Sequence, residues 1–263
     1  MVYGRQRSVG PRSGRPNSLI EELLVLASIK KKVSLVEDHG PLPTTLDGHP
    51  FFGIDLGEEQ KVFAEAILNP EYRWISAEAV AGSGKTTIAV GAACLLCYHK
   101  VCDEVLYVRV PTTETEQRVG FLPGTLGEKT RFYHAPLYNT LLKLGENPYT
   151  CINDDSMANQ KNGTGFITPL TDVYMRGEDY ERKAVIIDEA QNATVDQLKT
   201  IISRCHDDCK VIVIGSLLQV DLADKSCSGF QTCIDHFASQ PWAKVCHLTH
   251  NYRGEMSAWA DKM

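Results

Sequence analysis

The chain contains 263 residues, which suffices for one large α/β domain or at most two small ones. Hydrophobic residues make up 43% of it and charged residues 23%, as in ordinary globular proteins. The formal net charge of −6 argues against a protein that is basic over its whole surface, as many nucleic-acid-binding proteins are, but it allows a local basic channel.

Hydropathy and cysteine content indicate a cytoplasmic protein. No apolar run approaches the ~18 residues that span a bilayer, and no apolar segment directly follows the N-terminal arginines, so we expect neither a membrane span nor a secretory signal. The nine cysteines are an odd number. Cys94 and Cys97 lie three positions apart, but Cys205 and Cys209 lack the spacing of a second zinc or redox pair. The cysteines are therefore interpreted as reduced, mostly buried thiols.

The first 57 residues differ in composition from the rest of the chain. Residues 1–18 are rich in Gly, Pro, Ser and Arg and are expected to form a disordered basic tail. Residues 19–57 are expected to form a helical extension, Leu19–Lys32, followed by a linker rich in proline and glycine. The three lysines that end this helix suit a helix C-terminus. Residues 58–263 are expected to form the main domain.

From residue 58 onward, helical patterns alternate with short apolar strands. Strands are predicted at Trp74–Glu78, Glu104–Val110, Phe166–Pro169, Ala184–Asp188, Lys210–Gly215 and Lys244–Leu248. Helices are predicted at Glu58–Leu68, Lys85–His99, Gly127–Leu144, Val195–Cys205 and Gly229–Ala238. Apolar strands without clean alternation indicate an α/β fold, in which a mostly parallel sheet has helices on both faces and its chemistry at the carboxyl ends of the strands. The polar residues 145–165 are expected to form an exposed insertion.

The segment Ala79–Thr87, AVAGSGKTT, lies between a predicted strand and a predicted helix, which is the context of a phosphate-binding P-loop. Its glycines let backbone N–H groups point at a polyphosphate, and the N-terminus of the following helix adds partial positive charge. Lys85 would reach the β- and γ-phosphates, and the Thr86 hydroxyl would bind Mg²⁺. The first glycine of the motif is Ala79 here, which is tolerable at negative φ. The predicted nucleotide-binding residues of this segment are Ala81, Gly82, Ser83, Gly84, Lys85, Thr86 and Thr87.

Two carboxylates lie at the end of the predicted strand Ala184–Asp188: Asp188 is its last residue, and Glu189 follows directly. A charged pair at the end of an apolar strand is costly to bury unless something binds there. Asp188 would hold Mg²⁺ through water, and Glu189 would orient and deprotonate the attacking water. The next strand leads to Gln219, which would sense the γ-phosphate or hold that water, or would cap backbone groups of a turn. A base beside a metal ligand favours hydrolysis over phosphoryl transfer to a small molecule.

The whole pattern resembles the PhoH-like ATPases, a family related to the first motor domain of superfamily-one helicases. The resemblance covers roughly residues 58–235 and implies a single RecA-like P-loop NTPase domain. The stretches that carry it occur in the family's order: AGSGKT (81–86), VGFLPGTLGEK (119–129), APLYNTL (135–141), YMRG (174–177), VIIDEAQNAT (185–194), QLKTIISR (197–204) and GSLLQVDL (215–222).

The resemblance also bears on residues outside the phosphate-binding loop and the Asp188–Glu189 pair. Gln60 matches the position that reads the adenine edge, although a solvent-exposed helix residue is the alternative. Ser216 stands where the family usually has an aspartate, and this difference removes one charge near the metal. Arg109 lies one position out of register with the family's arginine, which puts its role in doubt. Arg253, in LTHNYR, resembles an arginine that contacts the phosphates, although it could instead form a structural salt bridge.

The implied function is Mg²⁺-dependent ATP hydrolysis coupled to RNA or single-stranded DNA. Since the chain has room for one motor lobe only, a second subunit would have to complete the cleft, which favours a homo-oligomer. The basic groups that could contact phosphates are Arg5, Arg7, Arg12, Arg15, Lys30, Lys31, Lys32, Arg118, Lys129 and Arg131. Their alternative interpretation is a solvated tail and ordinary surface charges. The alternatives are an ATP-driven switch or scaffold that acts on a protein partner, and a small-molecule kinase.

Overall fold

A computed structural model describes residues 40–110, 135–153, 165–170 and 179–260, all of which belong to one compact unit, residues 34–263. Several predicted features lie outside the described residues: the basic tail, the helix Leu19–Lys32, the GFLPG and YMRG stretches, and all ten of the basic groups named above. The boundaries at residues 18 and 57 therefore remain predictions.

A six-stranded sheet forms the centre of the described chain, with the strand order β3-β2-β4-β5-β1-β6 and every pair parallel. The strands are β1 (Trp74–Ala79), β2 (Glu104–Arg109), β3 (Ile167–Leu170), β4 (Lys183–Asp188), β5 (Lys210–Gly215) and β6 (Ala243–Leu248). Each strand begins and ends within one residue of its predicted bounds. β4 and β5 are buried along almost their whole lengths, which explains their unbroken apolar sequences.

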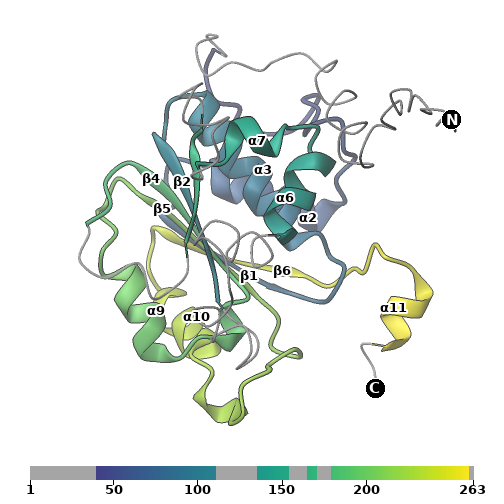
Figure 1. The fold of residues 1–263 in the computed structure, drawn as a ribbon, viewed down its shortest axis with the longest axis vertical. Coiled ribbons are helices and arrows are strands. Elements are labelled where there is room, and N and C mark those ends of the chain that lie inside the picture. The colour runs from purple at the N-terminus through teal and green to yellow at the C-terminus, as the bar shows by residue number, and fades with distance from the viewer. Residues whose placement is uncertain (1–39, 111–134, 154–164, 171–178, 261–263) are drawn as a thin grey trace, which may run out of the picture. The chain divides into compact units, whose positions relative to one another are not determined.

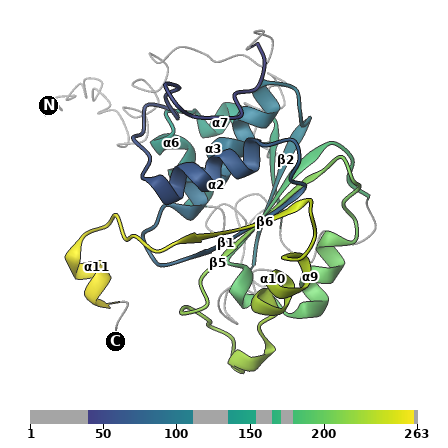
Figure 2. The ribbon, with the colours of Figure 1, turned by 180° about the vertical axis from the view of Figure 1, so that it is seen from behind.

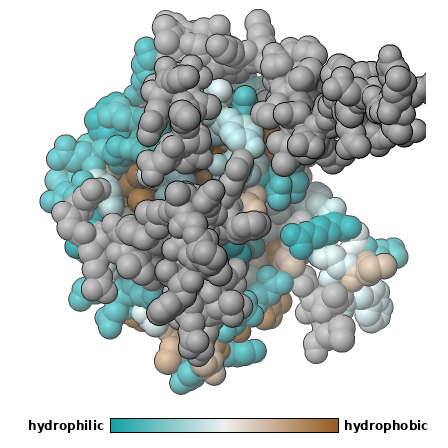
Figure 3. All heavy atoms as spheres, in the orientation of Figure 1, coloured by the Kyte–Doolittle hydropathy of each residue, from teal (hydrophilic) through white to brown (hydrophobic). Residues whose placement is uncertain are grey.

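Helices cover both faces of this sheet (Figures 1 and 2). One face carries α2 (Glu58–Leu68), α3 (Lys85–Tyr98), α6 (Ala135–Lys143) and the short α7 (Pro148–Cys151), and the other carries α9 (Val195–Ile202) and α10 (Phe230–Phe237). Each face has its own hydrophobic core. On the face seen in Figure 3, hydrophilic residues predominate on the described surface, with smaller hydrophobic areas between them. The predicted α/β fold with a parallel sheet and helices on both faces is confirmed.

The segment before α2 packs on the core of the first face. Leu46 and Phe51 are buried in it, and the Leu46 amide donates a 2.8 Å hydrogen bond to the Glu65 carboxylate. Phe51 reaches α3 at Gly91, where an added Cβ would lie 2.7 Å from the ring. Part of the predicted linker is thus tied to the main domain.

Three details differ from the sequence predictions. The described part of the predicted insertion, residues 145–153 and 165, is not simply exposed, because Cys151 and Ile152 are buried and Ile152 bridges to Ile167 of β3. The Asn147 side chain caps α7 and Pro148 starts it, a helix-start signal that the polar composition obscured. The helix α9 ends at Ile202, three residues early, and a further helix, α11 (Glu255–Ala260), was not predicted. Among the described residues, no helix is long and apolar enough to cross a bilayer.

Candidate functional site

The loop between β1 and α3 has the backbone of a phosphate-binding turn. Gly82 and Gly84 adopt φ values of 72° and 85°, which an L side chain rarely takes. The 14-residue helix α3 begins directly afterwards at Lys85, so its first N–H groups face the loop without intrahelical partners. Ala79 is the buried last residue of β1 and does not have a positive φ, so a methyl group fits there as predicted.

Asp188, at the end of β4, is a buried acid whose two oxygens are both bound. Oδ2 accepts hydrogen bonds from the Thr86 hydroxyl at 3.1 Å and the Tyr107 hydroxyl at 2.6 Å, and Oδ1 accepts one from the Glu189 amide at 2.9 Å. Burial raises the pKa of Asp188, the neighbouring Glu189 charge adds to this, and Lys85 opposes it. A buried carboxylate beside a hydroxyl is a hard-oxygen donor set suited to Mg²⁺, whose charge would offset the cost of burial.

Glu189 follows Asp188 in a backbone conformation that is unusual for its type. Its φ of 57° lies in the left-handed region, which costs about 1 kcal/mol or more for a residue with a side chain. Such strain is typical of functional positions. One carboxylate oxygen, Oε1, lies 3.8 Å from the Lys85 ammonium, and both side chains are mostly shielded from solvent. The loop lysine and the second acid therefore face each other.

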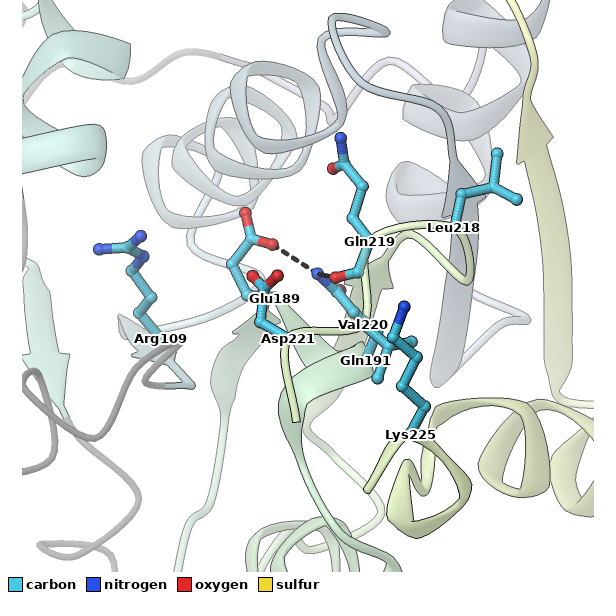
Figure 4. Close-up of a pocket in the computed structure, with 8 residues that line it drawn as sticks. All are labelled: Arg109, Glu189, Gln191, Leu218, Gln219, Val220, Asp221 and Lys225. Carbon is cyan, nitrogen blue, oxygen red and sulfur yellow. Dashed lines mark hydrogen bonds between the residues drawn. The ribbon is translucent and has the colours of Figure 1, made fainter. Parts of the chain in front are cut away.

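Beyond Glu189, a pocket of about 500 Å³ opens at the carboxyl ends of β4 and β5 (Figure 4). Gln219 lines it together with Glu189, which places the predicted γ-phosphate sensor and the predicted base on one cavity. Arg109 lines the same pocket and lies opposite Asp188 in the register of β2 and β4. The other lining residues are Gln191, Leu218, Val220, Asp221 and Lys225.

At the other end of the loop, Gln60 is buried rather than solvent-exposed. Its Nε2 donates to the carbonyl of Ser83 at 2.7 Å, and its Oε1 accepts from the Gly57 amide at 3.0 Å. The amide thus connects the start of α2 to the phosphate-binding loop. The alternative of an exposed helix residue is wrong for Gln60.

The segment after β6 lies against the same loop. The Tyr252 amide donates to the Gly82 carbonyl at 3.0 Å, and the Arg253 side chain lies so close to Gly82 that an added Cβ would be 2.9 Å from its Cγ. The half-exposed Tyr252 ring reaches Gly57. The arginine of the LTHNYR stretch is therefore brought to the candidate site.

Sequence reasoning missed three residues of this site: Tyr107, Gln191 and Tyr252. Tyr107 is the one hydroxyl in the apolar strand EVLYVR, and a buried hydroxyl needs a partner, so its position was a usable signal. Gln191 is buried in the turn after Glu189, where the sequence offers no comparable pattern. Ser216 is also buried, and its Oγ has no hydrogen-bond partner within the described residues.

The cysteines do not form a competing site. All nine are free, and the described residues contain no group of three or more His, Cys, Asp or Glu side chains that could hold a metal ion. The convergence of Lys85, Thr86, Asp188 and Glu189 on one end of a parallel sheet instead defines a P-loop nucleotide-binding domain.

Comparison with known proteins identifies the family of this domain. A family model described as "PhoH-like protein" matches residues 55–259. Protein PhoH of Escherichia coli strain K12 is 34% identical over 182 residues, which are 68% of this chain and 48% of that protein. A PhoH-like protein of a Synechocystis species is 36% identical over 169 residues, 64% of this chain and 48% of that protein. The chain belongs to the PhoH-like family of P-loop NTPases. It spans about half the length of the curated relatives that it matches.

Proposed function

We propose that the chain binds Mg²⁺-ATP and hydrolyses it. The observation that carries this proposal is the pair of contacts across the sheet edge, Thr86 with Asp188 and Lys85 with Glu189. Bound at Thr86 and Asp188, Mg²⁺ would supply charge neutralisation for the β- and γ-phosphates. The Lys85 ammonium would contact the same phosphates, and the loop from Ala81 to Thr87 would cradle them with backbone N–H groups.

In the proposed reaction, a water molecule lies between Glu189 and Gln219. The water oxygen bonds to the γ-phosphorus, the bond from that phosphorus to the bridging oxygen breaks, and ADP leaves with the electron pair. Glu189 takes the proton of the water, and Gln219 holds the water or the γ-phosphate. Both side chains line one pocket, which supports these roles.

Gln60 and Arg253 would contact opposite parts of the nucleotide. Each polar atom of the Gln60 amide makes one hydrogen bond in this structure and can make a second, because Nε2 carries two hydrogens and Oε1 has two lone pairs. It could therefore still read an adenine edge. Arg253 lies on the phosphate-binding loop, where a guanidinium would stabilise charge on the γ-phosphate.

We further propose that turnover is coupled to RNA or single-stranded DNA and that the chain works as a homo-oligomer in the cytoplasm. The described residues form one parallel sheet with one phosphate-binding loop, as in a single motor lobe, and a second copy that closes over the nucleotide would complete the cleft. Arg109 and Lys225 at the pocket could meet nucleic-acid phosphates. The nine free cysteines suit a reducing compartment.

A switch or scaffold that acts on a protein partner is the second candidate. Its support is the exposure of two large apolar side chains: Leu218, which lines the pocket, is 72% exposed, and Met256 of α11 is 89% exposed. Exposed apolar groups of this size can mark protein-binding surfaces.

Phosphate release from Mg²⁺-ATP, measured with and without RNA over a range of salt concentrations, tests these proposals together. Stimulation by RNA that weakens as salt rises supports the nucleic-acid-coupled ATPase. Hydrolysis without stimulation by RNA or single-stranded DNA favours the protein-directed switch. No hydrolysis under any of these conditions contradicts both.

A further inference from the structure

The side-chain amide of Gln191 connects the proposed base to the neighbouring strand. Its Nε2 donates to Glu189 Oε2 at 2.7 Å and to the carbonyl of Gln219 at 3.1 Å, and its Oε1 accepts from the Ser216 amide at 3.0 Å. Gln191 is 1% exposed, and the close-up in Figure 4 shows its amide beside Glu189 and Gln219. Both amide hydrogens therefore have acceptors, one on each side of the pocket.

The end of β5 is shaped to admit this amide. A Cβ added to Gly215 would lie 2.7 Å from Gln191 Oε1, closer than real Cβ contacts come, and 3.1 Å from its backbone nitrogen, which is a tight contact. Any larger residue at position 215 would push the amide out of place. The arrangement thus depends on one glycine and one glutamine from segments 24 positions apart.

Gln191 also decides which way the Glu189 carboxylate faces. The two oxygens of Glu189 have different neighbours, since Oε1 faces Lys85 Nζ at 3.8 Å and Oε2 accepts the Gln191 bond. A carboxylate released from Gln191 could close on Lys85. The closer ion pair would occupy the group that must accept a proton and the group that must contact phosphate.

We propose that Gln191 is a positioning residue, which holds Glu189 for activation of water and links its orientation to the loop Gly215–Gln219. This inference rests on the proposed ATPase function. The loop carries Gln219, so a displacement of that loop by the γ-phosphate or by a partner in the pocket is transmitted through the Gln191 amide to Glu189. In this proposal Gln191 acts through Glu189 and not directly on the nucleotide or the water.

The chain offers a matched pair of variants for the test. Gln191→Glu keeps the length of the side chain and the acceptor for the Ser216 amide but removes both donated hydrogen bonds. Asn192→Asp makes the same amide-to-acid change in the next buried residue. It keeps the acceptor for the Asp221 amide, and the Nδ2 that it removes has no hydrogen-bond partner among the described residues. Gln191→Met provides a second, uncharged replacement of similar length.

Steady-state hydrolysis and equilibrium binding of Mg²⁺-ATP are measured for the unmodified chain and all three variants, with thermal unfolding as the check on folding. We expect kcat to fall roughly 10–100-fold in both Gln191 variants, while the Kd for Mg²⁺-ATP changes less than about twofold. Asn192→Asp should keep the kcat of the unmodified chain. A merely structural role for Gln191 would change Kd and the unfolding temperature along with kcat.

The outcomes separate this inference from the function on which it rests. Near-normal kcat in Gln191→Met, together with loss of hydrolysis in Glu189→Gln, overturns the role of Gln191 and leaves the ATPase proposal intact. An equal loss of kcat in Asn192→Asp also overturns it. Absence of hydrolysis by the unmodified chain overturns both.

Discussion

The hydroxyl of Thr86 donates a 3.1 Å hydrogen bond to Oδ2 of Asp188, although 102 positions separate the two residues. The contact exists because β1, which precedes the phosphate-binding loop, and β4, which ends at Asp188, run parallel on either side of β5. Their carboxyl ends therefore meet at one edge of the sheet. The order of the strands in the sheet therefore brings together the two oxygen donors of the proposed Mg²⁺ site.

Lys85→Ala should abolish stabilisation by nucleotide. A ligand at one hundred times its Kd stabilises the folded state by about 2.7 kcal/mol, or roughly 5–10 °C in melting temperature for a domain of this size. The variant lacks the ammonium that we propose contacts the phosphates, so its melting temperature should not respond to Mg²⁺-ATP. Thermal unfolding with and without Mg²⁺-ATP measures this, and Lys199→Ala on the exposed face of α9 is the control. Equal ATP affinity in Lys85→Ala and the unmodified chain would contradict the role of Lys85.

Glu189→Gln should retain binding and lose turnover. The amide keeps the size of the side chain but cannot take a proton from water, a contribution worth about 10²–10⁴ in rate. Phosphate release should fall by that factor, while the Kd for Mg²⁺-ATP stays near that of the unmodified chain. Glu71→Gln, at an exposed position outside the site, controls for the loss of one charge. The proposal for Glu189 fails if the variant hydrolyses ATP at a near-normal rate.

Ser216→Asp introduces the acid that the resemblance to PhoH-like ATPases led us to expect at this position. Ser216 is 1% exposed, so an added carboxylate without a cation should destabilise the fold by about 3 kcal/mol. Mg²⁺-ATP should recover most of this loss by supplying the missing positive charge. Melting temperatures with Mg²⁺ alone, with Mg²⁺-ATP and with EDTA test this, and Ser216→Ala should differ little from the unmodified chain. A loss that Mg²⁺-ATP does not recover would show that position 216 lies away from the metal.

Glu59 attaches the segment after β6 to α2. Its carboxylate accepts hydrogen bonds from the Thr249 hydroxyl and amide, both at 2.6 Å, and the hydroxyl bond is the largest cause that lowers the pKa of Glu59 below its ordinary 4.5. Because the folded pKa is the lower one, the contact stabilises the fold above about pH 4.5 and is lost as the pH falls through the folded value.

At neutral pH, Glu59→Gln should imitate that loss. Hydrogen exchange of the Thr249 and His250 amides should accelerate, and Mg²⁺-ATP should bind more weakly because Tyr252 and Arg253 lie on the same segment. Exchange mass spectrometry gives the first result and a binding titration the second. Glu58→Gln, on the exposed neighbouring position, is the control. Unchanged exchange at both amides would show that Glu59 does not hold this segment.

The sequence was sufficient for the sheet and for the centre of the site. Residues 184–187 form an unbroken apolar run bounded by Lys183 and Asp188, which is typical of a strand buried on both faces. Once two such strands were recognised as parallel, the loop lysine and Asp188 had to meet at one edge. The α/β fold could therefore be predicted from the apolar strand sequences and from their alternation with helices.

The remaining contacts depend on register and local backbone, which sequence patterns do not encode. Tyr107 reaches Asp188 because it pairs with Ile186, two positions before the acid on the neighbouring strand. The positive φ of Glu189 and the three hydrogen bonds of Gln191 arise only in the folded turn. The α7 turn was missed because polar neighbours concealed its asparagine cap.

Phosphate release from ATP by the purified chain, compared in Mg²⁺ and in excess EDTA, tests the central claim most directly. If Thr86 and Asp188 hold Mg²⁺ while Lys85 and Glu189 act on the triphosphate, release should require Mg²⁺ and disappear in Asp188→Asn. Release that persists in EDTA, or that Asp188→Asn carries out at the rate of the unmodified chain, would contradict this account of the site.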